Sequence, residues 1–483
     1  MSAPWDGGRV AITIDRSQTT PITMQITNTL RAAIVEGRLR PGTRLPSWLD
    51  MAAQLGVSRG TVKAAYEALA DEFLVYSAGA AGTRVAERAA PRPTEVRQID
   101  IPRPLQDLER GFSLKPLPFQ MGVPAQDAFP HKLWARLRTR AVRANAMAPV
   151  GPSDPRGEPE LRAQIAAQLA ITRGICCHPD QIVLTSGYKN GLSLTLLALG
   201  AQGRTAWVED PGYPVARMAL AIAGLKAVPI PVDTKGIRVD HGVRAAPDAA
   251  LAIVTPGQQA PTGVTLSPER RRALLAWAQR EEAWIVEDDY LSELQLGGRA
   301  APALAAEDPA GRVIHIGTFG KTISPSLGLG FVVAPLALAA RFGEVAGYLN
   351  PAPNVTTQLA LTDFLADGHF LRHLRHMKAL YRQRRDDLHA RLDPSIAVDA
   401  FAGLAVVAHL PRDFDDVALA KHAPELGVAP CPLSVWYANP AEARPGLLLC
   451  VTNLRPQILD KACDALATLI DDPAAVPVPA RAA

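Results

Sequence analysis

The chain of 483 residues carries 51 Lys and Arg against 47 Asp and Glu, for a net charge of +4 at pH 7, and 48% of its residues are hydrophobic. These values predict about three globular domains with ample core, and the small net charge means that any nucleic-acid site must be local. Five cysteines, odd in number and without paired CxxC spacing, support neither a disulfide framework nor a zinc site and indicate a reducing compartment. The first nine residues lack an apolar signal segment and no stretch approaches ~18 apolar residues, so we expect a cytoplasmic protein.

Three helices are expected near the N-terminus. Apolar residues recur at three- and four-residue spacing over residues 22–34, and a glycine ends that helix. Ser47, followed three residues later by Asp50, forms a capping box that opens a second helix. Ser58 caps a third helix over residues 59–72. Because a short Gly-containing turn joins the second and third helices, the pattern predicts a helix-turn-helix.

Two short apolar segments, residues 74–76 and 83–86, follow the third helix and are separated by a glycine-containing turn. They predict a two-stranded wing. The N-terminal unit is therefore expected to be a winged helix-turn-helix of the α+β class. A small helical protein-interaction domain is the alternative.

The third helix is expected to place its first residues on base edges in the major groove of DNA. Arg59 and Thr61 suit base contact, whereas Lys63 and Arg84, on the helix and the wing, suit phosphate contact. Ser58, at the cap, completes the predicted DNA-binding set.

Residues 17–88 resemble the GntR-type winged helix. The resemblance rests on Arg44-Leu45-Pro46-Ser47, on the segment from Leu55 to Val62, and on Tyr66-Glu67-Ala68-Leu69. One departure is Leu49, where the family usually has a DNA-contacting arginine. Loss of that arginine removes about 1–3 kcal/mol of base discrimination or a phosphate contact, which predicts a non-standard operator.

Residues 89–118 carry six prolines among charged residues and predict a semi-stiff linker. Beyond it, apolar strands alternate with helical segments, which predicts a mainly parallel sheet with ligands at the carboxyl ends of its strands. The expected strands cover residues 182–185, 206–209, 251–254, 284–287, 313–316 and 331–333.

Polar groups that suit pyridoxal 5′-phosphate follow these strands. Lys321, behind a buried strand, is expected to be desolvated and able to form a Schiff base with an aldehyde, and Asp288 would keep a pyridine nitrogen protonated. Ser186-Gly187 starts a helix whose N-terminus can hold a phosphate. Tyr213 lies on a turn where its ring could stack on the cofactor, or serve only as a loop anchor, and Tyr290 can hydrogen-bond the ring hydroxyl. A metal site at Asp288-Asp289 lacks nearby histidines in sequence.

These motifs resemble the fold-type I aminotransferases and, together with the winged helix, the MocR/GabR family of transcription regulators. The resemblance covers almost the whole chain and implies an aminotransferase-like domain over residues 119–475, with a smaller α/β subdomain near 350–475. It implies a head-to-tail homodimer that binds operator DNA and senses a small amine, an amino acid or the cofactor. The implied roles are Schiff-base lysine for Lys321, pyridine partner for Asp288, ring-hydroxyl partner for Tyr290, stacking aromatic for Tyr213, and phosphate ligands for Ser186, Gly187 and Thr318.

The sequence departs from the family pattern at several ligand-contacting positions. A serine before the lysine, a phosphate-binding arginine, a tyrosine that reaches the partner subunit, a carboxylate-binding arginine and a histidine are replaced, respectively, by Gly320, Gly328, Pro152, Leu448 and Gln258. A charge-assisted hydrogen bond is worth about 1.5–3 kcal/mol, so cofactor affinity is expected to fall. An α-amino acid has no bidentate clamp unless Arg444 or Arg455 substitutes.

Three hypotheses follow. The leading one is a regulator with a cofactor-binding, aminotransferase-like effector domain and no net turnover. The second is a working aminotransferase with an accessory DNA-binding domain. The third is a regulator whose degenerate pocket binds another metabolite.

Overall fold

The computed structural model describes residues 10, 12–87, 116–148, 151, 153–297, 300–349, 354–392, 394, 397–400 and 403–471. The chain divides into two compact units, residues 1–104 and 105–483. Pro152 and most of the expected linker lie outside the described residues. In the part of the chain that is described, no helix is long and apolar enough to cross a membrane.

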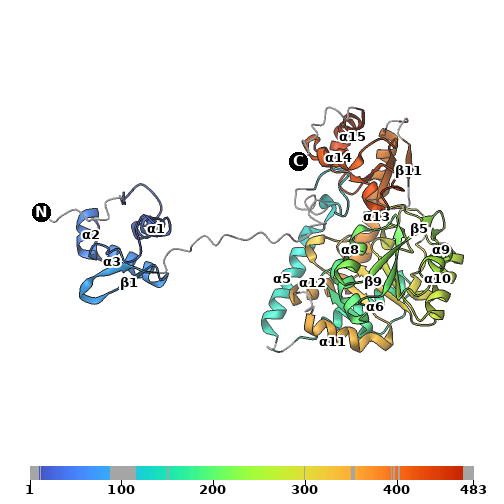
Figure 1. Cartoon of the computed structure of the whole chain (residues 1–483), viewed down its shortest axis with the longest axis horizontal. Helices are drawn as coiled ribbons and strands as arrows, with labels where there is room; N and C mark the ends of the chain where they lie inside the picture. The colour runs from blue at the N-terminus through green and yellow to red at the C-terminus, as the bar shows by residue number, and fades with distance from the viewer. Residues whose placement is uncertain are drawn as a thin grey trace. The chain divides into compact units, whose positions relative to one another are not determined.

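The first unit is a three-helix domain with a two-stranded wing (Figure 1). Its helices are α1 (Ile22–Val35), α2 (Trp48–Leu55) and α3 (Arg59–Asp71), and its strands are β1 (Val75–Ser77) and β2 (Thr83–Val85). Both expected caps form, since Ser47 Oγ accepts from Asp50 N and Ser58 Oγ accepts from Thr61 N, each at 3.1 Å. Gly56, with φ of 63°, makes the left-handed turn between α2 and α3.

The core of the first unit consists of the apolar faces of its helices and wing. Ile26 and Leu30 of α1, Leu69 of α3 and Val85 of β2 are fully buried. The predicted winged helix-turn-helix is confirmed.

The second unit is built on an eight-stranded sheet with the order β3-β10-β9-β8-β7-β4-β5-β6. Strands β4, β7, β8 and β9 pair in parallel, as do β4 and β5, whereas β10 runs antiparallel to both β3 and β9. The mainly parallel sheet is thus confirmed. The strands are β3 (Ile182–Thr185), β4 (Thr205–Asp210), β5 (Lys226–Asp233), β6 (Gly236–Ile237), β7 (Leu251–Val254), β8 (Trp284–Asp289), β9 (Val313–Thr318) and β10 (Gly330–Val333).

Two of these strands, β5 and β6, are missing from the sequence-based expectation. Pro229 and Pro231 interrupt β5, and proline removes a donor from the strand ladder. The strand tolerates them because it lies near the sheet edge, with only the two-residue β6 beyond it. The two prolines therefore argue against a strand in the sequence, although the position of β5 near the sheet edge allows one.

Helices cover both faces of the sheet (Figure 1). On one face, α7 (Tyr188–Leu199), α8 (Pro214–Ile222) and α11 (Ala339–Leu349) pack on alternate residues such as Val208 and Val286. The opposite face packs on the neighbouring residues, including Ile285. It is covered by α6 (Pro159–Thr172), α9 (Val239–Ala245), α10 (Pro268–Arg280), α12 (Val355–Ala366) and α13 (His369–Arg391). A further helix, α5 (His131–Met147), packs against α12.

A smaller α/β layer closes the C-terminal part of the second unit. Its antiparallel sheet has the order β11-β12-β14-β13, formed by β11 (Val398–Ala400), β12 (Ala405–His409), β13 (Cys431–Pro432) and β14 (Gly446–Cys450). Helices α14 (Asp416–His422) and α15 (Pro456–Asp471) accompany it (Figure 1).

Candidate functional site

Lys321 and Asp288 come to the same edge of the large sheet. Strands β8 and β9 are parallel neighbours, with Asp288 opposite Ile316 and Asp289 opposite Gly317, so their carboxyl ends meet. Lys321 follows β9 by three residues, and its Nζ donates to the carbonyl oxygen of Gly122 at 3.1 Å. Burial lowers the pKa of the Lys321 ammonium, which favours the neutral, nucleophilic amine.

Asp288 is a buried acceptor with unused capacity. Its side chain is buried, and among the described residues Oδ1 has no hydrogen-bond partner. Burial raises the pKa of this carboxyl well above its ordinary value, the charge of Asp289 raises it further, and the nearby hydroxyl of Tyr188 lowers it. A protonated ring nitrogen would supply both the missing donor and the missing positive charge. The chemistry at Asp288 therefore fits the pyridine nitrogen of pyridoxal phosphate.

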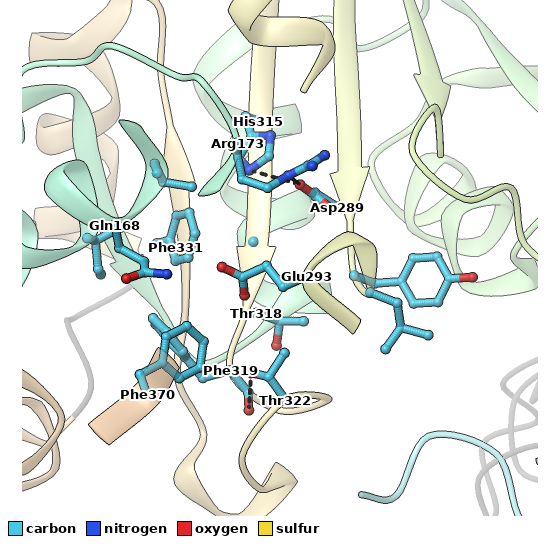
Figure 2. A pocket seen from close by; sticks show the side chains of 15 residues that line it. Gln168, Arg173, Asp289, Glu293, His315, Thr318, Phe319, Thr322, Phe331 and Phe370 are labelled. Atoms are coloured by element: carbon cyan, nitrogen blue, oxygen red, sulfur yellow. Dashed lines mark hydrogen bonds and ion pairs between the residues drawn. The ribbon is translucent and has the colours of Figure 1, made fainter. Parts of the chain in front are cut away.

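Two of the expected phosphate ligands, Ser186 and Gly187, lie at the start of α7, and the third, Thr318, ends β9 and lines the cavity shown in Figure 2. Strand β10 lies between β3 and β9, so Gly330 pairs with Thr185 on one side and Thr318 on the other. A Cβ at Gly330 would lie 2.9 Å from the Cα of Gly187, so glycine allows this close approach. Ser186 and Gly187, at the N-terminus of α7, thus lie beside the end of β9, where helix amides favour an anion.

Aromatic side chains form a wall next to this edge. The ring of Tyr213 lies 5.8 Å from that of Tyr188 and 5.7 Å from that of Trp436. Tyr188, Tyr213 and Asp288 line one small cavity together with Thr255. The sequence pattern does not single out Tyr188, which belongs to a helix start, or Trp436, which lies more than 200 residues from its neighbour Tyr213.

Hydrogen bonds join the small C-terminal layer to the segment around Tyr213. Gly212 N donates to Trp436 O at 3.0 Å, and Ala438 N donates to Asp210 Oδ1 at 2.8 Å. Arg217, in α8, donates to the carbonyl oxygens of residues 212, 435, 436 and 437 at 2.9–3.4 Å. Asp210 and Arg217 therefore hold the segment that carries Trp436 against Tyr213.

The structure shows the surroundings of three positions that depart from the family pattern, Gly328, Leu448 and Gln258. Gly328 has φ of 55°, a left-handed conformation that an arginine would adopt with strain. Leu448 is 1% exposed. Arg444 and Arg455, the two alternative clamps, are both exposed. Gln258 is buried, and its Oε1 has no hydrogen-bond partner within the described ranges.

Behind Asp288, on the opposite face of β8, lies a buried ionic cluster that the sequence analysis missed (Figure 2). Arg173 Nε donates to Asp289 Oδ2 at 2.6 Å, and His315 Nδ1 lies 3.0 Å from Glu287 Oε2. Side chains alternate along a strand, so Glu287 and Asp289 share the face that Asp288 avoids. The described residues contain no cluster of three or more side chains suited to a metal. Asp289 has an ion-pair partner in Arg173, and His315, which is distant in sequence, brings Nε2 to 3.8 Å from Asp289 Oδ2.

The proposed DNA-reading residues lie at the exposed start of α3. Ser58, Arg59 and Lys63 are exposed, and Ser58 Oγ lies 2.7 Å from Thr61 Oγ1. Lys63 forms a surface ion pair with Glu67 at 3.6 Å. Arg84 differs from the simple expectation, because its Nη1 donates to Gly42 O at 2.8 Å and its side chain is partly buried.

Near the wing, the sequence analysis missed a contact of Arg44. A Cβ at Gly82 would lie 3.0 Å from Arg44 Nε, so the guanidinium lies against the wing turn. Leu49, in the first turn of α2, is 43% exposed. An exposed leucine therefore stands where the family pattern has a charged side chain.

The fold and site define a class of protein in which a winged helix is joined to an aminotransferase-like domain. Residues 22–85 match the bacterial regulatory proteins of the gntR family, and residues 136–466 match aminotransferase class I and II. Among solved structures, an archaeal alanine:glyoxylate aminotransferase superposes with a TM-score of 0.68 at 24% identity, over 76% of this chain and 93% of that one. A Pyrococcus horikoshii kynurenine aminotransferase also reaches 0.68, at 22% identity over 78% and 96%. These likenesses show the fold.

Curated relatives show the family. The chain is 35% identical to the probable rhizopine catabolism regulatory protein MocR of Rhizobium meliloti, over 94% of this chain and 95% of the relative. It is 35% identical to the pyridoxine biosynthesis transcriptional regulator PdxR of Corynebacterium glutamicum, over 77% and 79%. For the transcriptional regulator TauR of Rhodobacter capsulatus the identity is 32%, over 88% and 91%. The chain belongs to the MocR-type family of transcription regulators.

Proposed function

We propose that this protein binds pyridoxal 5′-phosphate at Lys321 and changes its binding to operator DNA in response to a small amine, an amino acid or the cofactor itself. The observation that carries the proposal is the pairing of a buried lysine with a buried, unpartnered Asp288 Oδ1 at adjacent strand ends. Membership of a PLP-dependent fold family supports it.

Each side chain of the site has a proposed role. Lys321 would bind the aldehyde through Nζ, and Asp288 would accept from the ring nitrogen. Tyr290 would hydrogen-bond the ring hydroxyl, and Tyr213 would stack on the ring. Ser186, Gly187 and Thr318 would hold the phosphate. Pyridoxal phosphate, when bound, would supply an aldehyde group that can form a Schiff base with a primary amine.

The DNA-binding unit is proposed to extend over residues 17–88 and the effector domain over residues 119–475, with the small subdomain from about residue 350. We place the protein in the cytoplasm, with the operator DNA, as a head-to-tail homodimer. Ser58, Arg59, Thr61 and Lys63 face the DNA, and Arg84 contributes through the wing.

The cofactor proposal predicts an absorption band in the visible or near-ultraviolet range for the purified chain supplied with pyridoxal phosphate. Borohydride should fix a pyridoxyl group on Lys321, and Lys321→Ala should remain colourless, because its methyl group cannot attack an aldehyde. Lys226→Ala, at an exposed lysine, is the matched control and should keep the band. Equal colour in Lys321→Ala would place the chromophore elsewhere, and a colourless wild type would favour a pocket for another metabolite.

An active aminotransferase is the second candidate function, favoured by the presence of both Lys321 and Asp288. Buried Leu448 counts against it, because productive orientation of an amino acid substrate supplies much of the rate. In the same preparations, transamination of common amino acids with 2-oxoglutarate should stay near background. Turnover on the order of 1 per second would establish the enzyme instead.

A further inference from the structure

A buried apolar cluster borders the proposed cofactor site. Five buried apolar side chains from both layers of the second unit pack together, and we call them the apolar wall. They are Ala260, Val407, Leu433, Trp436 and Leu448. Tyr213 and Tyr290, the two residues proposed to face the cofactor ring, pack directly against the wall. A ligand held at Lys321 would therefore extend from the ring toward the apolar wall.

Three arginines that lie close to the apolar wall in space or in sequence are already used or exposed. Arg217 donates to four carbonyl oxygens, in the segments around Gly212 and Trp436. Arg444 and Arg455, which flank Leu448 in the sequence, are exposed to solvent.

We propose that the ligand sensed at Lys321 is a primary amine with an uncharged, largely apolar body and no carboxylate, and that Leu448 determines this specificity. The prediction that the ligand is an amine rests on the proposed function. The apolar wall is the basis for the prediction that the rest of the ligand is uncharged. A carboxylate held against the wall would lose its hydration without gaining a cation. This penalty should weaken binding by about 100-fold or more.

Two matched ligand pairs test the proposal with the full chain loaded with pyridoxal phosphate. Isoamylamine and leucine differ only in the α-carboxylate, as do phenethylamine and phenylalanine. Titration followed by the absorption spectrum gives each Kd, and the shift of the unfolding temperature gives a second readout. In at least one pair the amine should bind about 100-fold more tightly than its amino acid.

A charge introduced at position 448 should reverse the preference. Leu448→Arg is expected to gain affinity for leucine and phenylalanine, because a guanidinium can pair with the carboxylate in a bidentate manner. Leu336→Arg, which adds the same charge at an exposed leucine outside the apolar wall, is the control and should behave like the wild type. If Leu448→Arg does not fold, the comparison of ligand pairs on the wild type still decides.

Two results would overturn this ligand class. The first is amino acids that bind as tightly as their matched amines, which would reveal a cation supplied from elsewhere. The second is a normal cofactor spectrum that neither amine alters, and that result would leave the proposed function standing. A chain without any cofactor spectrum would instead overturn the proposed function and this inference together.

Discussion

At the scale of single residues, the alternation of side chains along β8 places Asp288 and Asp289 on opposite faces of the sheet. Asp288 faces the side of β8 where the side chains of Tyr188 and Tyr213 lie, and one of its carboxylate oxygens has no hydrogen-bond partner in the described structure. Asp289, its neighbour, faces the other side and is held by Arg173 (Figure 2). Both carboxylates lie at the end of the same buried strand, so the sequence alone marks the pair. The pleat of the strand places the two side chains on opposite faces of the sheet and so gives them different surroundings.

Glu209 predicts a pH dependence of stability. Burial raises the pKa of its carboxyl from 4.5 to about 7, although Thr255 and Gln259 donate to it. Between these values the unfolded chain has released the proton while the folded chain retains it, so this group makes folding less favourable as pH rises. Below about 4.5 both states hold the proton and the penalty is absent.

Glu209→Gln cannot ionise and should flatten this dependence. Urea unfolding of wild type and variant at about pH 5 and about pH 7 measures it, with a relative gain for the variant of up to about 3 kcal/mol at the higher pH. A constant difference between the two proteins across this range would show that Glu209 does not titrate there.

At the scale of elements, α3 is specified locally. Ser58 accepts from Thr61 N, and such a cap contributes about 1 kcal/mol. Val62 and Leu69 bury one face of the helix, which leaves Arg59 and Lys63 exposed near its start. All of these features lie within 12 residues of each other, and the sequence pattern predicts them correctly.

Arg59 and Lys63 should contribute differently to DNA binding. Arg59→Ala is expected to lose about 1–3 kcal/mol and to relax the preference at one base position, because a base contact is specific. Lys63→Ala should weaken all sequences alike and lower the salt dependence, as expected for a phosphate contact. Fluorescence anisotropy with DNA selected from a random pool, at several salt concentrations, measures both.

Loss of Lys63 also frees Glu67, its ion-pair partner. Glu67→Gln is therefore the control that separates the ion pair from the phosphate contact. Wild-type affinity in both the Arg59 and Lys63 variants would show that another element reads the DNA.

At the scale of the whole molecule, residues 1–104 and 105–483 are separate compact units. Each has its own core, and the first is held by the α1, α3 and wing contacts. We therefore expect two unfolding transitions, of which only the larger unit's should respond to the cofactor.

Pyridoxal phosphate at about 100 times its Kd should stabilise the second unit by about 2.7 kcal/mol, which corresponds to a rise of roughly 3 °C for a domain of this size. Differential scanning calorimetry measures both transitions, and Lys321→Ala should abolish the rise. An equal rise in both transitions would mean that the two units unfold together.

The sequence by itself determined the local features of this protein. Helix caps, strand periodicity and the residues that follow strands depend on a few neighbours, so Ser47, Ser58, Asp288 and Lys321 could be placed on their elements in advance. Their proposed roles remain predictions. The sequence pattern missed β5, because its two prolines argue against a strand unless its place near the sheet edge is known.

Only the tertiary structure decided which distant residues meet. The contacts of Tyr213 with Tyr188 and Trp436, and the pairing of Arg173 with Asp289, join residues that are from 25 to more than 200 positions apart. Such contacts arise from the packing of the two layers around the sheet, and no local pattern encodes them. The same packing places Leu448 in the apolar wall, against which Tyr290 also packs. The sequence shows a leucine in place of the arginine of the family pattern, and the fold places that leucine in contact with residues proposed to face the ligand.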